Sequence, residues 1–210
     1  MKRGKFITIE GGDGSGKTTQ IENIVSYLEE HKIDVVRTRE PGGTVFGEEM
    51  RKLILGSNMD MSYLTQAMLM FAARHEHLIQ VILPALEKER WVVCDRFTDS
   101  TFAYQGIGHK VPFYKLEMLD FLATGSFKPD LTIYLDVGVE TGKKRSSQTG
   151  EDKDRFETQL DDFKQRVRDY YLSLANGPVE RVKLVDAEKS LEEVADQVND
   201  VLGNFIEENS

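Results

Sequence analysis

The 210-residue sequence is poor in several kinds of feature, and each shortage excludes a class of protein. It has one cysteine, Cys94, so no disulfide can form within the chain. No apolar run approaches the length of a membrane span, and Lys2, Arg3 and Lys5 lead into a short apolar stretch instead of a signal peptide. No proline-rich or serine-rich linker and no internal repeat divides the chain. We therefore expect one cytoplasmic domain over residues 1–210.

Positive charge is also scarce. The chain has 27 basic and 36 acidic residues, a net charge of −9. A nonspecific grip on nucleic acid or on an anionic membrane is not expected from such a chain. A bound polyanion would have to be held by a local cluster of basic groups.

Five short apolar runs, rich in β-branched residues, alternate with longer segments of helical spacing. The runs cover residues 6–9, 35–38, 91–94, 131–135 and 182–185. Nearly continuous apolarity is typical of parallel strands that are covered on both faces. The sequence predicts an α/β fold in which a five-stranded parallel sheet is covered by helices, with ligands at the carboxyl ends of the strands.

The first run is followed by a glycine-rich loop that fits the pattern G-x-x-x-x-G-K-[ST]. It starts at Gly11 and ends at Gly16, Lys17 and Thr18. In such a loop backbone N–H groups surround phosphate oxygens, the lysine reaches the outer phosphates, and the hydroxyl can ligate magnesium. The alternative is a glycine-rich turn with no ligand. The preceding strand and following helix favour a nucleotide-phosphate site.

Charged residues follow the second and third runs. Arg39 and Glu40 precede a Pro-Gly-Gly turn whose glycines allow close approach of backbone to a ligand, although such a segment alone is also typical of a turn with a surface ion pair. Asp95 has the position of a magnesium-associated aspartate, and Arg96 could hold a second phosphate bidentately. Asp136 has a similar position, but we interpret it as a structural cap.

The helical segment 66–86 carries an apolar platform beside a guanidinium group. Met70 and Arg74 are four residues apart, and Phe71 lies beside them, an arrangement suited to a flat ring with polar edges. The alternative is a core stripe with an exposed arginine. His75 and His77 point to different sides of a helix, so we expect solvated histidines and no metal pair.

Two further segments have polar side chains of interest. Thr101, Tyr104 and Gln105 could read a base edge and crowd a sugar, or simply begin an amphipathic helix. Positive charge gathers near residues 143–155, which predicts either a solvated helix end or a mobile lid over a transferring phosphate. The residues concerned are Lys143, Lys144, Arg145, Lys153 and Arg155.

Taken together, these motifs resemble those of the bacterial thymidylate kinase family over essentially the whole chain. The matching segments begin at Glu10, Thr38, Ala72, Asp95, Ala103, Lys128, Asp154 and Val185. The resemblance implies a P-loop NTPase fold of three layers with a short mobile lid at about residues 143–157. It also implies an enzyme that transfers the γ-phosphoryl group of ATP to dTMP with Mg²⁺, usually as a homodimer.

The resemblance further implies roles for individual residues. Catalysis would involve Lys17, Asp13, Asp95, Arg96 and Arg155, with magnesium held by Thr18 and Asp95 and the transferred phosphoryl group by Arg155. ATP would be bound by Gly11, Gly12, Asp13, Gly14, Ser15, Gly16, Lys17, Thr18, Thr19 and Arg145. The acceptor dTMP would be bound by Asp13, Arg39, Glu40, Arg51, Met70, Phe71, Arg74, Arg96, Thr101, Tyr104 and Gln105, of which Arg39 and Arg96 would hold its phosphate.

The chain departs from the family pattern at the base platform. Where the family usually has phenylalanine four residues before the pocket arginine, this chain has Met70, with Phe71 beside it. Either Met70 supplies a softer platform, or the helix shifts so that Phe71 serves. Gly14 and Ser15 stand where some members carry a loop arginine, which favours the subtype whose lid arginine acts on the phosphate.

Three other functions are compatible with parts of the pattern. The first is a different nucleoside-monophosphate or deoxynucleoside kinase on the same fold, since base choice depends on a few hydrogen bonds. The second is a GTP-dependent switch protein, although the Asn-Lys-x-Asp motif expected for guanine is absent. The third is a noncatalytic nucleotide-binding module, which would need neither Arg96 nor a lid.

Overall fold

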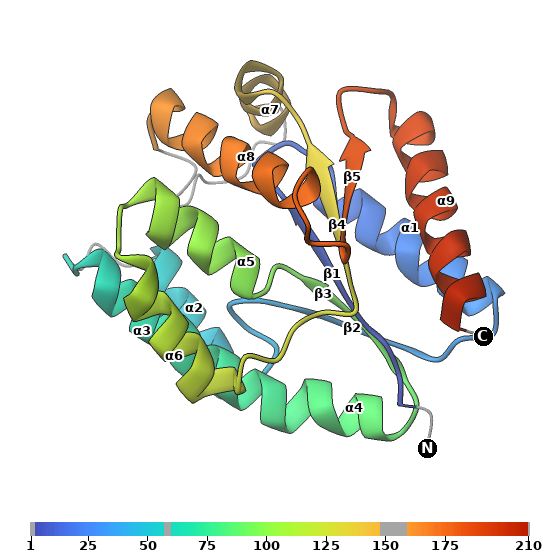
Figure 1. Ribbon diagram of the computed structural model, residues 1–210, viewed down its shortest axis with the longest axis horizontal. Helices are drawn as coiled ribbons and strands as arrows, with labels where there is room; N and C mark the ends of the chain where they lie inside the picture. Colours follow the sequence, from blue (N-terminus) through green and yellow to red (C-terminus); the bar gives the residue numbers. More distant parts are fainter. Residues whose placement is uncertain (1–2, 57–59, 148–158, 210) are drawn as a thin grey trace.

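The computed structural model describes residues 3–56, 60–147 and 159–209. Its centre is one parallel sheet with the strand order β2-β3-β1-β4-β5 (Figure 1). The strands are β1 (Phe6–Gly11), β2 (Val35–Arg39), β3 (Trp91–Asp95), β4 (Leu131–Asp136) and β5 (Val182–Asp186). All five predicted strands are confirmed, and each extends one or two residues further than its apolar run.

Helices cover both faces of the sheet, which explains the unbroken apolar runs in the strands. Every residue of β1 is buried. On one face lie α1 (Lys17–Glu30) and α9 (Leu191–Asn209), whose apolar sides share a core with β1 and β4 (Figure 1). The predicted three-layer α/β fold is confirmed.

The opposite face carries six further helical elements of the described residues. They are α2 (Val45–Gly56), α3 (Tyr63–His77), the π-helical turn η1 (Leu78–Ile82), α4 (Leu83–Glu87), α6 (Phe113–Thr124) and α8 (Asp161–Ala175). The last residues of α3 continue directly through η1 into α4, so the predicted helix over residues 66–86 is present but interrupted by π-helical backbone. None of the helices in the described ranges is both long and apolar enough to cross a membrane.

Short elements lie at the carboxyl edge of the sheet. After β3 the chain forms α5 (Thr98–Thr101) and the π-helical segment η2 (Phe102–Gly108), and after β4 it forms α7 (Val139–Ser146). The loops after β1, β2 and β3 meet here as well. Because the parallel strands all end at this edge, segments distant in sequence are brought together.

Candidate active site

The loop between β1 and α1 depends on glycine for its shape. Gly14 and Gly16 have left-handed backbone, with φ of 70° and 86°, which side chains disfavour. A Cβ on Gly14 would overlap the carbonyl group of Gly142, so the loop packs backbone to backbone on α7. The N–H groups of the loop and of the first turn of α1 therefore lie at the carboxyl end of β1, where phosphate-binding loops are found.

Lys17 lies against this loop. Its Nζ donates hydrogen bonds to the carbonyl oxygens of Gly11 and Gly12, each at 3.0 Å. Burial, together with the positive charge of Arg96, lowers the pKa of Lys17 to about 8. Two cations held at one site favour an anion between them, since its charge would relieve their repulsion.

Beside the loop is a cavity whose empty space, with the open solvent at its mouth included, is ≈ 610 Å³. It contains nine of the eleven residues predicted to bind the acceptor, all except Arg39 and Phe71. Asp13 lines this cavity and belongs to the phosphate loop, so the cavity and the loop are contiguous. The lining residues are Asp13, Glu40, Pro41, Arg51, Leu55, Met70, Arg74, Arg96, Phe97, Ser100, Thr101, Tyr104 and Gln105.

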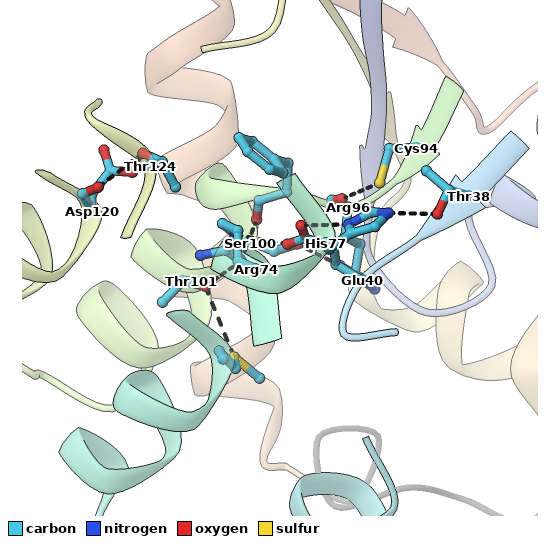
Figure 2. Close-up of polar contacts among 12 residues, drawn as sticks. Thr38, Glu40, Arg74, His77, Cys94, Arg96, Ser100, Thr101, Asp120 and Thr124 are labelled. Atoms are coloured by element: carbon cyan, nitrogen blue, oxygen red, sulfur yellow. Dashed lines mark hydrogen bonds and ion pairs between the residues drawn. The ribbon is translucent and has the colours of Figure 1, made fainter. Parts of the chain in front are cut away.

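Arg74 is buried and tightly held, so the interpretation of an exposed arginine on a core stripe is wrong. Its Nε donates to Glu40 Oε2 at 2.6 Å, and its Nη2 donates to Thr101 Oγ1 at 3.0 Å and to the carbonyl of Phe97 at 3.2 Å (Figure 2). Its Nη1 has no hydrogen-bond partner among the described residues. This nitrogen is a spare donor in the wall of the cavity.

Gln105 is the second spare polar group. The side chain is fully buried on η2, and neither amide atom has a partner within the described part of the chain. Buried polar atoms in proteins are nearly always paired. An amide with both a free donor and a free acceptor, beside the free donor of Arg74, suits the edge of a base.

The structure places the two candidate platform residues differently. Met70 lines the cavity, and its Sδ accepts a hydrogen bond from Thr101 Oγ1 at 3.8 Å. Phe71 is buried in a separate core cluster with Ala67, and the Cζ atom of Arg74 lies 4.7 Å from the centre of its ring. Phe71 therefore packs against Arg74 from the core, and the orientation of α3 places Met70, not Phe71, at the cavity.

The two arginines predicted for the acceptor phosphate also differ in position. Arg96 lies in the cavity wall, with Nη1 3.1 Å from Ser100 Oγ and Cζ 5.1 Å from the centre of the Tyr104 ring. Arg39 is exposed and forms an ion pair with Glu48 at 2.9 Å. The predicted surface ion pair after the second strand thus exists, but Glu40 is not part of it.

Tyr104 is held against Arg96. Burial raises the pKa of Tyr104 to about 12. The phenol therefore stays neutral at physiological pH and adds no negative charge to the cavity.

Asp95 ends β3 at the same edge. Its Oδ1 is buried and has no hydrogen-bond partner in the described ranges. A carboxylate oxygen left unpaired in this way suits a hard cation such as Mg²⁺. Thr18, the other predicted magnesium ligand, is exposed at the start of α1, as is Thr19. No cluster of three or more His, Cys, Asp or Glu side chains able to hold a metal occurs in the described residues, so phosphate oxygens and water would complete the coordination.

Glu10 was not among the predicted site residues, although it ends the first strand. It is fully buried, and it accepts hydrogen bonds from the Phe97 N–H at 2.9 Å and from the hydroxyls of Ser100 and Tyr171, each at 2.7 Å. Burial raises its pKa. The signal for Glu10 in the sequence was a carboxylate that directly follows an apolar run.

Several other expectations are corrected. Asp136 is not a cap, because both its oxygens accept from Arg168 at 2.8 and 2.9 Å. Gly42 and Gly43 lie close to other parts of the protein, since a Cβ on them would lie 2.6 Å from Glu48 Oε1 and 2.5 Å from the His77 ring.

His75 is exposed as expected, but His77 is fully buried. No local spacing indicates a partner for His77, since its partners are Thr38 at the end of β2 and Glu40 in the loop after it, 39 and 37 residues away in the sequence. Cys94 packs in the core, as expected, and burial raises its pKa.

The predicted lid falls largely outside the described residues. Arg155 and Lys153 lie outside the described residues. Lys143, Lys144 and Arg145 are in the last turn of α7. Arg145 donates hydrogen bonds to the carbonyl oxygens of Ala187, Glu188 and Lys189, which follow β5.

Comparison with known proteins agrees with this geometry. The family model described as Thymidylate kinase matches residues 9–198. The thymidylate kinase of Nitrosospira multiformis is 50% identical over 91% of this chain and 93% of its own length. Those of Alkalilimnicola ehrlichii and Nitrosomonas eutropha are 47% and 48% identical, each over 98% of this chain and 95% of its own length. The chain belongs to the thymidylate kinase family of enzymes.

Proposed function

We propose that the protein transfers the γ-phosphoryl group of ATP to dTMP, giving ADP and dTDP for the synthesis of dTTP. One observation carries the proposal: beside the glycine-rich loop opens a cavity lined by Arg74 and Gln105, whose side chains have polar atoms without a hydrogen-bond partner among the described residues. The proposed donor and acceptor sites adjoin each other, because Asp13 belongs to both.

The donor site in this proposal is the loop of residues 11–19. Its amides and Lys17 hold the ATP phosphates, and Arg145 at the end of α7 lies near the adenine. Mg²⁺ between Thr18, Asp95 and the phosphates would neutralise charge on the outer phosphates. The buried, unpaired Oδ1 of Asp95 supports this position for the metal.

The acceptor site is the adjoining cavity. Arg74 and Gln105 bond the edge of thymine, Met70 covers its face, and Tyr104 and Asp13 lie beside the sugar. Thr101 fixes Arg74, and Arg51 closes the wall. The residue placements in the cavity support these roles for the seven side chains, whereas Phe71 supports Arg74 only from the core and Glu40 acts by holding it.

In the reaction, an oxygen of the dTMP phosphate attacks the γ-phosphorus as the bond to the bridging oxygen breaks, and ADP leaves. Positioning and charge neutralisation dominate such transfers. Arg96 holds the acceptor phosphate, with Arg39 completing its binding by a swing of its exposed side chain away from Glu48. Lys17 and Arg155 neutralise the transferring group.

We propose further that the chain is a single domain with a lid near residues 143–157 and works in the cytoplasm as a homodimer. The second copy would cover the apolar side of α6. On that helix Tyr114, Met118, Phe121 and Leu122 are spaced so as to share one side and are 59–74% exposed.

The test is ATP consumption with Mg²⁺ against a panel of thymidine, deoxyuridine, uridine, cytidine, guanosine and adenosine monophosphates. We expect dTMP to give the highest kcat/KM. GTP hydrolysis without an acceptor would instead indicate a switch protein. Turnover with another acceptor would keep the kinase chemistry but refute the roles given to Arg74 and Gln105.

A further inference from the structure

A second layer of polar side chains lies behind the acceptor cavity. Its centre is His77, in the last turn of α3, which is fully buried and does not line the cavity. The imidazole contacts side chains on both sides: Nδ1 lies 3.0 Å from Glu40 Oε1, and Nε2 lies 2.6 Å from Thr38 Oγ1. Figure 2 shows His77 between these two residues.

The direction of the hydrogen bonds follows from the chemistry of the groups. An ionised Glu40 can only accept, so Nδ1 of His77 carries the proton and donates it. In the neutral ring Nε2 then accepts from the hydroxyl of Thr38. The other oxygen of Glu40 accepts from Nε of Arg74 at 2.6 Å. Glu40 is therefore held from two directions, by His77 and by Arg74.

The effect of this chain of contacts reaches the cavity through Arg74. Glu40 and Thr101 fix two of the three guanidinium nitrogens and leave Nη1 unpaired among the described residues. If Glu40 could rotate, the guanidinium plane would lose the bond that sets its angle. The direction of the free Nη1 donor thus depends on an imidazole that no substrate touches.

The packing around the ring leaves it little freedom. A Cβ on Gly43 would lie 2.5 Å from the imidazole and 2.7 Å from Thr38 Oγ1, so the loop after β2 lies directly on both. Gly43 has a left-handed backbone with φ of 76°. The loop that carries Glu40 is thereby clamped against α3, the helix that carries Arg74.

We propose that His77 is a positioning residue for acceptor binding: it orients Glu40 and, through Glu40, the free donor of Arg74. The inference rests on the proposed function, because it assigns a purpose to the free Nη1. It predicts a selective loss in dTMP binding, whereas a purely structural histidine would affect folding and both substrates alike.

The experiment compares three variants with the wild type by steady-state kinetics in dTMP and in ATP and by thermal unfolding. His77→Leu removes both hydrogen bonds. His77→Asn keeps an amide donor near the position of Nδ1 and should retain the bond to Glu40. Thr38→Val removes only the distal hydroxyl. His31→Leu is the control, since His31 also bonds through Nδ1, to the Tyr27 carbonyl, but follows α1 at the end remote from the phosphate loop.

We expect His77→Leu to raise KM for dTMP by about tenfold or more, with KM for ATP unchanged and kcat within about threefold of the wild type. His77→Asn should restore most of the loss, Thr38→Val should show a smaller one, and the control should show none. If His77→Leu lowers the unfolding temperature and leaves KM for dTMP unchanged, or raises both KM values equally, the inference is refuted.

The same experiment separates this inference from the proposed function. A wild-type protein without dTMP-dependent turnover would overturn the proposed function and this inference together. An active wild type whose KM for dTMP is insensitive to His77→Leu would overturn this inference alone.

Discussion

At the scale of single residues, one side chain of the acceptor cavity lowers the stability of the fold in a way that ligand binding could offset. Gln105 buries a donor and an acceptor with no partner in the described part of the chain, and such burial costs about 1–3 kcal/mol for each unsatisfied group. A bound ligand that supplied the missing partners would offset this cost. Function and stability should therefore respond in opposite directions to a substitution here.

Gln105→Leu tests this relation. It removes the unpaired amide while keeping most of the side-chain volume, so the unfolding temperature should stay equal or rise. kcat/KM for dTMP should fall by about tenfold to a hundredfold, because base contacts are lost. Steady-state kinetics and thermal unfolding measure the two effects.

Gln66→Leu is the matched control for this variant. Gln66 is also buried, and its Oε1 also has no partner among the residues that the structure describes, but it lies on α3 outside the acceptor cavity. The control should leave kcat/KM for dTMP unchanged. If Gln105→Leu behaves like the control in both measurements, Gln105 does not contact the acceptor.

At the scale of elements, the phosphate loop takes its position from α7 as well as from β1 and α1. A Cβ on Gly142 would lie 2.5 Å from the carbonyl oxygen of Asp13. Only glycine permits this approach of the helix to the loop. The helix that ends with Arg145 is thus in direct backbone contact with the loop that holds the phosphates in our proposal.

Gly142→Ala should separate the two elements. Moving the loop away from the added methyl group costs about 1–3 kcal/mol of unfolding free energy. Because the loop amides shift, KM for ATP should rise by about tenfold, with a smaller effect on KM for dTMP. Urea unfolding and kinetics in ATP measure these changes.

Gly56→Ala provides the comparison, since a Cβ there meets no atom of the described residues within 4 Å. It should change neither quantity appreciably. Wild-type KM for ATP in Gly142→Ala would show that the loop does not need α7 for its function.

At the scale of the whole molecule, apolar surface remains on the side of the sheet away from α1 and α9. The exposed side chains of α6 lie beside α3, which carries exposed Met68. Patches of this kind on a monomer commonly mark an interface. The proposed homodimer would remove this surface from water.

Leu122→Glu should therefore dissociate the dimer. A buried, unpaired carboxylate at an interface is strongly unfavourable. Light scattering should give about twice the 23.9 kDa chain mass for the wild type and the chain mass for the variant, with unchanged circular dichroism. Leu184→Glu, on edge strand β5, is the control and should remain dimeric. A wild type that is monomeric at micromolar concentration would refute the proposal.

The sequence by itself determined the sheet, the phosphate loop and most of the cavity. Five apolar runs were sufficient for a parallel sheet, since only strands covered on both faces are apolar throughout. Glycine spacing predicted the loop between the first strand and helix, because Gly14 and Gly16 adopt a left-handed backbone that side chains disfavour. Nine of the eleven predicted acceptor residues line one cavity, since the ends of parallel strands meet at one edge.

Only the tertiary structure decided how polar side chains pair across elements. His77 and Glu40 are 37 residues apart, and Asp136 meets Arg168 over 32 residues. No local spacing encodes such pairs, so His77 was predicted to be solvated and Asp136 to be a cap. Tertiary packing also decided between Met70 and Phe71. The two residues are neighbours in the sequence, and the rotation of α3 about its axis sets which side chain faces the cavity and which faces the core.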